Sequence, residues 1–346
     1  MMKKLLHPRN MVFVSILLIV FGLPATAQSV SYHLLKKVPL GAAAGGGEYF
    51  DYLMADSSAR RVYVSHGTEV KVVDADSGAV VGTISGFKKS HGIVVPDGSG
   101  KGFVTDGDAG KVFVFDVKTL KITGEIKTAD DSDSIIYDPA SKHIFAFNGD
   151  SHSASVIDSV SATVVKTLEM GGGPEFAVAD GKGMVFNNIE DKNEVAAIDS
   201  QTLTIKQRWP VAPAGTPTAL AMDRAHRRLF SAGRKPQMVV MIDADTGKVL
   251  QSLPISAGVD AAAFEDETGL LFVSTREGNV HIFHEDSPSK LSEVQTLKTE
   301  YGAKTMALDT KTHNLYLSTV DFEPASGANG RRTPKPGTFH LLIYTR

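Results

Sequence analysis

Short apolar segments alternate with turn residues along almost the whole chain, and they recur at a nearly constant distance. An apolar residue followed by Asp closes one such segment at Val73-Asp74, Phe115-Asp116, Ile157-Asp158, Ile198-Asp199 and Ile242-Asp243. These Asp residues lie 42, 42, 41 and 44 residues apart. A second apolar segment has seven centres, 40 to 45 residues apart, at Tyr63, Phe103, Phe145, Val185, Phe230, Phe272 and Tyr316. A fixed period of this length predicts a repeat protein with one supersecondary unit per repeat.

Each repeat contains four short segments with the period of a β-strand. In the repeat over residues 90–128 the expected strands are 91–95, 102–105, 111–116 and 120–126. Turn residues separate them, for example Pro96-Asp97-Gly98-Ser99-Gly100, and no segment keeps a helical period for long. Four strands in about 42 residues are typical of a propeller blade. The sequence therefore predicts an all-β, seven-bladed β-propeller with four antiparallel strands per blade.

The last repeat has only three of its four strands. These are expected at 304–309, 314–319 and 338–344, where the chain stops. The segment 32–40 resembles the fourth strand of an earlier repeat, at 249–255. Because a missing fourth strand would leave an open sheet edge in the ring, we expect the N-terminal strand to close the last blade.

Several repeat segments carry a family resemblance. Residues 61–65 (RVYVS), 72–78 (VVDADSG) and 91–98 (HGIVVPDG) resemble the YVTN-repeat, YncE-like family of bacterial propellers. The resemblance extends over nearly all of residues 32–346. It implies an exported propeller and no particular activity. A WD40 propeller is not indicated, because Trp209 is the single tryptophan and lacks the Asp partner of that motif.

The first 27 residues have the pattern of a signal peptide. Lys3, Lys4 and Arg9 precede an apolar run at 11–23, and Ala25-Thr26-Ala27 offers the small residues of a cleavage site. We expect cleavage after Ala27, a single propeller domain at 28–346, and a periplasmic or secreted protein with no transmembrane segment after cleavage. The alternative is a retained membrane anchor, for which the apolar run is short.

The amino-acid composition bears on which partners the protein can bind and on how it is stabilised. The signal peptide carries three basic residues and no acidic one, so cleavage takes the net charge from −3 to −6. Such a charge gives no overall attraction to nucleic acid or anionic lipid. Cysteine is absent, so stability comes from packing without disulfides. We expect a monomer.

Polar residues recur where the innermost strand of each repeat begins. Alignment on the repeat centres places there Asp51, His91, Asp133, Glu175, Thr218, Asp260 and Lys304. The innermost strands line the central channel, so these residues should form a ring at one channel mouth. Carboxylates with an imidazole suit a ligand or a hard or borderline divalent cation. The alternative is a solvated mouth that tolerates polar side chains, with Lys304 between Asp260 and Asp51 balancing their charge.

One long irregular segment, 321–335, carries Arg331, Arg332 and Lys335. It is expected to be a basic flap over the same mouth, or else a solvated insertion without a role.

The remaining motifs give no catalytic assignment. Residues 74–78 and 243–247 resemble calcium loops but lack the later Glu, and they fit hairpin turns. The glycine runs 45–47 and 171–173 are not followed by the residues of a phosphate loop, and Gly-x-Ser-x-Gly is absent. We therefore expect a non-enzymatic binding or interaction scaffold for an unidentified ligand or protein partner. The alternative is a metal-dependent propeller enzyme, lactonase-like or lyase-like, that uses the channel-mouth ring.

Overall fold

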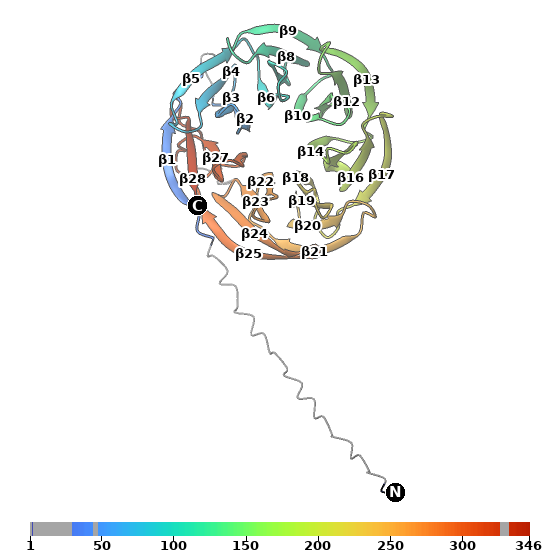
Figure 1. Ribbon diagram of the computed structural model, residues 1–346. Helices are drawn as coiled ribbons and strands as arrows, with labels where there is room; N and C mark the ends of the chain where they lie inside the picture. The colour runs from blue at the N-terminus through green and yellow to red at the C-terminus, as the bar shows by residue number, and fades with distance from the viewer. Residues whose placement is uncertain (1, 3–29, 44–47, 326–331) are drawn as a thin grey trace.

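Alternating strand and turn segments fold into β-sheets that are arranged as blades around one axis (Figure 1). The computed structural model describes residues 2, 30–43, 48–325 and 332–346. These residues form seven antiparallel sheets of four strands each. The predicted seven-bladed propeller is confirmed.

Each of blades 1 to 6 is one continuous stretch of chain whose strands run from the axis outward. Blades 1 and 2 consist of β2 (Phe50–Asp56), β3 (Arg61–His66), β4 (Glu69–Asp74), β5 (Val80–Ser85), β6 (Ser90–Val94), β7 (Lys101–Asp106), β8 (Lys111–Asp116) and β9 (Ile122–Lys127). Blades 3 and 4 consist of β10 (Ser132–Asp138), β11 (His143–Asn148), β12 (Ser153–Asp158), β13 (Thr163–Glu169), β14 (Pro174–Ala179), β15 (Met184–Ile189), β16 (Glu194–Asp199) and β17 (Thr204–Pro210). Blades 5 and 6 consist of β18 (Pro217–Asp223), β19 (Arg228–Arg234), β20 (Gln237–Asp243), β21 (Val249–Pro254), β22 (Val259–Glu265), β23 (Leu270–Thr275), β24 (Asn279–Ser287) and β25 (Lys290–Lys298).

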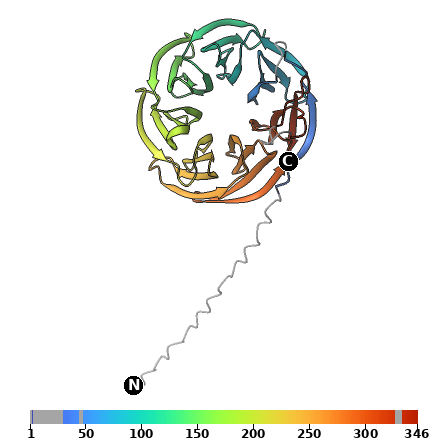
Figure 2. The same cartoon turned by 180° about the vertical axis from the view of Figure 1, so that it is seen from behind.

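Blade 7 joins the two ends of the described chain. It consists of β26 (Met306–Asp309), β27 (Asn314–Thr319), β28 (His340–Thr345) and, outermost, β1 (His33–Pro39). In Figures 1 and 2, β1 runs along the rim beside β28. The pairing is antiparallel, from His33 opposite Thr345 to Pro39 opposite His340. The predicted closure by the N-terminal strand is confirmed.

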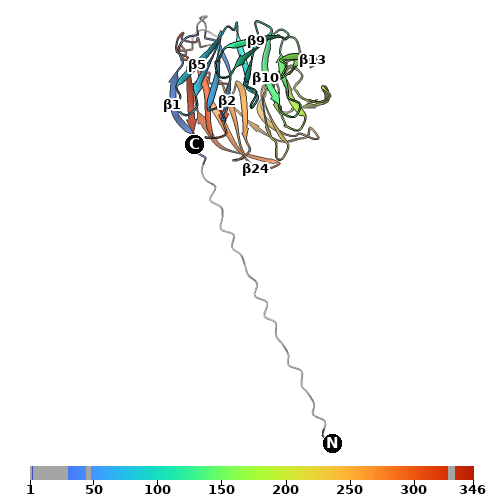
Figure 3. The same cartoon turned by 45° about the horizontal axis from the view of Figure 1, so that its top comes forward.

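Apolar side chains fill the seven interfaces between neighbouring blades. Seven buried clusters are present in the described chain, and each is shared by two adjacent blades. Six of the seven repeat centres are aromatic, and all seven are fully buried. Figure 3 shows the resulting packing of sheets face to face around the ring. Burial of this apolar surface is the main source of stability, since no disulfide contributes.

A β-bulge interrupts the inner strand of six blades close to its start. In β2, Phe50 pairs with His66 and the next pair is Leu53 with Val64, so Asp51 and Tyr52 oppose a single residue. The same interruption occurs in β6, β10 and β14, and a one-residue version occurs in β18 and β22. Bulges redirect side chains and are frequent beside functional sites. Here each bulge contains one of the polar residues predicted to form the ring.

The predicted signal peptide, residues 1–27, lies outside the described part of the chain except for Met2. The run 45–47 and Arg331 also lie outside it. No helix among the described residues is long and apolar enough to cross a membrane.

We expect removal of residues 30–40 to lower the free energy of unfolding by more than about 4 kcal/mol, because β28 would lose its outer partner and the ring its closure. Denaturant unfolding of a chain beginning at Gly41 measures the effect. A chain beginning at Val30, which keeps β1, is the control. Equal midpoints for the two chains would contradict the closing role of β1.

Candidate functional site

The inner strands bring the predicted ring residues to one end of the axis. Six of them occupy the second position of β2, β6, β10, β14, β18 and β22. The seventh, Lys304, lies two residues before β26, which begins later than expected. We call this set the mouth ring: Asp51, His91, Asp133, Glu175, Thr218, Asp260 and Lys304. Neighbouring inner strands contact one another all the way round the propeller.

His91 lies between two carboxylates from the neighbouring blades. Its Nδ1 is 2.8 Å from Oδ2 of Asp51 and 2.7 Å from Oδ1 of Asp133. The Tyr49 hydroxyl donates to Oδ2 of Asp51 at 3.0 Å and lies 2.9 Å from Nδ1 of His91. The His91 side chain is 4% exposed, so these contacts are shielded from water. The result is a buried carboxylate–imidazole–carboxylate bridge across blades 1, 2 and 3.

The charges of this bridge stabilise one another. Burial disfavours the charged form of His91, but Asp133 and Asp51 outweigh it and raise the pKa of His91 to about 10. Burial alone would raise the pKa of Asp51, but Lys304 and His91 outweigh it and hold that pKa below the usual range. Burial raises the pKa of Asp133. We therefore expect the bridge to contain an imidazolium at neutral pH.

Lys304 continues the network on the other side of Asp51. Its Nζ is 3.2 Å from Oδ1 of Asp51 and also contacts Asp260. Burial disfavours the Lys304 ammonium, but Asp51 and Asp260 outweigh it and raise the pKa of Lys304. Arg234, at the end of β19, binds Asp260 and lies 3.1 Å from Glu190. Charges thus alternate along a chain of ion pairs: Asp133, His91, Asp51, Lys304, Asp260, Arg234 and Glu190.

Two members of the mouth ring stand outside this chain of ion pairs. Glu175 has no ion pair within the described chain, and burial together with Asp133 and Glu190 raises its pKa well above the usual range. Thr218 is buried and its hydroxyl donates to the carbonyl of Thr216. The common offset in the sequence therefore predicts where a residue lies in the mouth ring. Whether that residue forms an ion pair depends on its charge and on its neighbours.

The network is poorly suited to metal binding in this protonation state. One ligand atom from each of Asp51, His91 and Asp133 lies within 4.8 Å of the others, which is close enough for a shared cation. A ligating imidazole must be neutral, however, whereas the two carboxylates raise the pKa of His91 and favour its protonated form. A metal ion would have to displace that proton.

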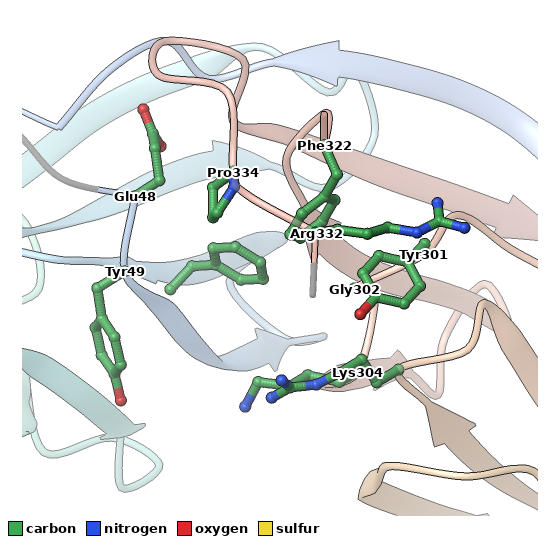
Figure 4. Close-up of a pocket in the computed structure, with 10 residues that line it drawn as sticks. Glu48, Tyr49, Tyr301, Gly302, Lys304, Phe322, Arg332 and Pro334 are labelled. Atoms are coloured by element: carbon green, nitrogen blue, oxygen red, sulfur yellow. The ribbon is translucent and has the colours of Figure 1, made fainter. Parts of the chain in front are cut away.

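Beside the mouth ring lies a cavity of about 330 Å³ formed by loops of blades 6, 7 and 1 (Figure 4). Its lining combines aromatic rings and charged groups: Glu48, Tyr49, Phe50, Arg276, Tyr301, Gly302, Lys304, Phe322, Arg332 and Pro334. Tyr49 and Lys304 belong both to this lining and to the contacts of the mouth ring. This volume is near the lower limit of the range for pockets that bind small molecules.

The charges in the cavity are not balanced. Glu48 accepts hydrogen bonds from Nε2 of His66 at 3.1 Å and from the backbone N–H of Gly337. Lys304 is held by its two aspartates. Arg276 and Arg332 are exposed and have no carboxylate within ion-pair distance in the described chain, and the Arg332 guanidinium lies over the Tyr301 ring at 4.4 Å. The cavity therefore presents two guanidinium groups without carboxylate partners in the described chain, one of them stacked on the aromatic ring of Tyr301.

Only part of the predicted basic flap reaches this cavity. Arg332 lines it, whereas Nζ of Lys335 lies 3.8 Å from Glu323, within the same segment. Arg331 lies outside the described residues.

Sequence reasoning missed Tyr49, Arg234, Arg276 and Tyr301. Tyr49 lies two residues before Asp51, Arg234 ends β19, and Arg276 directly follows β23. The loops before the first strand and after the second strand of a blade emerge on the same face. Tyr49, Tyr301 and Arg276 are charged or aromatic residues of these loops, which is the signal that could have identified them, whereas Arg234 is the last residue of a strand.

Comparison with known proteins gives the fold and no family. No family model and no curated protein matches the chain. Among solved structures, Kuenenia stuttgartiensis hydrazine synthase has a TM-score of 0.69 at 15% identity, with 91% of this chain and 99% of that chain covered. A chain of a mitotic checkpoint complex has a TM-score of 0.72 at 14% identity, with 96% and 99% covered. At this identity the likeness shows a shared propeller fold alone.

Replacing Lys304 with Met is expected to lower the free energy of unfolding by about 3–5 kcal/mol, because it leaves Asp51 and Asp260 buried without their shared cation. Denaturant unfolding at pH 7 measures the loss. Met at the exposed Lys248 is the control and should change stability by less than about 0.5 kcal/mol. A loss that small for Lys304→Met would show that the ion pairs do not hold the blades.

Proposed function

We propose that this chain is an exported propeller of the YVTN-repeat, YncE-like kind that binds a small anionic ligand in the cavity beside the mouth ring. The ligand would carry a carboxylate or similar anion on an aromatic or apolar body. The protein acts as a binding module and not as an enzyme.

The observation that supports this proposal is the pair of guanidinium groups without carboxylate partners. Arg276 comes from blade 6 and Arg332 from blade 7, so the two approach the cavity from different elements. Arginine forms bidentate hydrogen bonds with planar anions, which suits a carboxylate. Tyr301 and Phe322 meet edge to face with their ring centroids 4.9 Å apart and offer an apolar surface to the body of the ligand.

The mouth ring supports binding more readily than catalysis. Its imidazole, its ammonium and three of its carboxylates are already held in ion pairs. A metal-dependent hydrolase or lyase would need those groups free for an ion and a substrate. The network instead fixes Lys304 and Tyr49, which border the cavity.

Export and family membership rest on the sequence. The N-terminal pattern of basic, apolar and small residues is that of a cleavable signal peptide. The repeat segments supply the family resemblance. We therefore propose a periplasmic or secreted location, with cleavage after Ala27.

Aromatic carboxylates are expected to stabilise the protein against heat, and their neutral amides are not. A thermal-shift comparison of 4-hydroxybenzoate and indole-3-acetate with the corresponding amides tests the charge preference. Replacing both Arg276 and Arg332 with Gln should weaken carboxylate binding at least tenfold, because each charged hydrogen bond contributes about 1.5–3 kcal/mol.

Lys335→Gln is the matched control, since Lys335 belongs to the same segment as Arg332 but pairs with Glu323 instead of lining the cavity. Carboxylate binding that survives in the double variant, or that is lost equally in Lys335→Gln, would contradict the proposed site.

A further inference from the structure

The turns at the other end of the inner strands repeat one backbone feature in all seven blades. The residue directly before the second strand has a positive φ in every blade: Arg60, Gly100, Lys142, Gly183, Arg227, Gly269 and His313. The shared conformation makes these seven positions structurally equivalent. Their side chains can therefore be compared from one blade interface to the next.

At three interfaces a basic residue at this position binds a carboxylate of the preceding blade. Arg60 lies 2.6 Å from Asp309, and Arg227 lies 3.0 Å from Asp180. Nδ1 of His313 lies 2.8 Å from Glu265. In each case the carboxylate stands at the end of the first strand of the preceding blade and is almost fully buried. Two of these contacts are ion pairs with an arginine, and the third is a hydrogen bond with the His313 imidazole.

The interface between blades 5 and 6 departs from this arrangement in two ways. The equivalent carboxylate is Asp223, but the position of the cation is taken by Gly269. The second difference concerns the residue whose backbone N–H binds the carbonyl of the residue before the second strand. In blade 6 this residue is Glu285, which binds the carbonyl of Gly269. In five other blades the equivalent residue is small or apolar and neutral: Ala75, Val117, Ser159, Ser200 and Ala244. Glycine also takes the first position in blades 2 and 4, and Asp138, at the equivalent end of β10, is buried without an ion pair in the described chain, so the added carboxylate is the feature that distinguishes the interface of blades 5 and 6.

The two carboxylates face each other out of water. The side chains of Asp223 and Glu285 are 2% and 4% exposed. Oε1 of Glu285 is buried and has no hydrogen-bond partner in the described chain. Nδ1 of His226 lies 2.6 Å from Oδ2 of Asp223 and 3.8 Å from Oε2 of Glu285, and its side chain is 53% exposed. One ligand atom from each of the three residues lies within 4.8 Å of the others, with the imidazole on the solvent side.

Within the described residues no lysine or arginine lies at ion-pair distance from Asp223 or Glu285. Arg228 is the nearby basic residue, but its guanidinium donates to Asp243 and to the backbone carbonyls of Arg227 and Pro288. Two carboxylates without a counter-charge are costly in such a site.

We infer that Asp223, Glu285 and His226 bind a divalent metal cation, Zn²⁺ or Mn²⁺. The ion would take the place of the basic side chain that binds the equivalent carboxylate at the three interfaces described above. Two carboxylate oxygens and one imidazole nitrogen are ligands that both ions accept, and water can complete the shell on the exposed side. Calcium is disfavoured, because it requires six to eight oxygen ligands. The bound ion would replace the hydrogen bond between His226 and Asp223.

Titration of the metal-free chain with ZnCl₂ and MnCl₂, followed by calorimetry and by thermal unfolding, tests the site. The expected result is binding that raises the melting temperature and that is reduced at least tenfold in Glu285→Gln. Glu300→Gln is the matched control, since it removes one carboxylate from a separate cluster formed with Asp321 and His340. That variant should keep the Zn²⁺ or Mn²⁺ binding that Glu285→Gln loses.

A second variant tests directly whether a basic side chain can replace the metal ion at this interface. Gly269→Arg places arginine at a backbone conformation that Arg60 and Arg227 already adopt, and its Cβ would meet no atom closer than 3.7 Å. This variant should raise the melting temperature of the metal-free protein and remove the response to metal.

Two results would overturn the inference. One is wild-type chain that takes up neither ion, which would leave a proton shared by Asp223 and Glu285 as the counter-charge. The other is binding of undiminished affinity in both Glu285→Gln and Gly269→Arg, which would place the ion elsewhere.

Discussion

The alternating ion pairs at the inner ends of the blades are the interaction on which the site depends. The inner strands converge on the axis. The bulges near their starts bring polar side chains close together at the channel mouth. Carboxylates alone would repel one another there. His91 and Lys304 each stand between two of them, so the repulsion becomes a set of contacts that joins blades 1, 2, 3, 6 and 7.

That neutralisation determines which charges remain for a ligand. Lys304 borders the cavity, but its charge is already shared by Asp51 and Asp260. Arg276 and Arg332 lie farther from the carboxylates and keep their charge available. The same principle operates at the opposite end of the inner strands, where Arg60 and Arg227 neutralise buried carboxylates, whereas no arginine or lysine of the described chain pairs with Asp223 and Glu285 at the interface of blades 5 and 6. Charge balance between blades therefore links both candidate sites to the repeat architecture.

Repeat spacing was sufficient to predict the fold, because a period near 42 residues with bulky centres leaves few alternatives. It also located Asp51, His91 and Asp133, since equivalent positions of a repeat occupy equivalent places in the ring. It could not predict which of these residues form ion pairs, as Thr218 and Glu175 show, because pairing depends on distances between blades. The cavity escaped prediction for a related reason. Arg276 and Tyr301 come from loops of unequal length, where the period is lost, and Arg332 was expected only as part of a flap.

The central claim is that the mouth ring carries its own counter-charge in a protonated His91. The most direct measurement is an NMR pH titration of the histidine ring carbons in the folded protein, with His91→Gln used to assign the signal. The account predicts that the His91 signal keeps its imidazolium shift from pH 6 to pH 9 and titrates near pH 10. A His91 that titrates near its ordinary value of about 6.5 would contradict the account, because the two carboxylates would then share no buried cation at neutral pH.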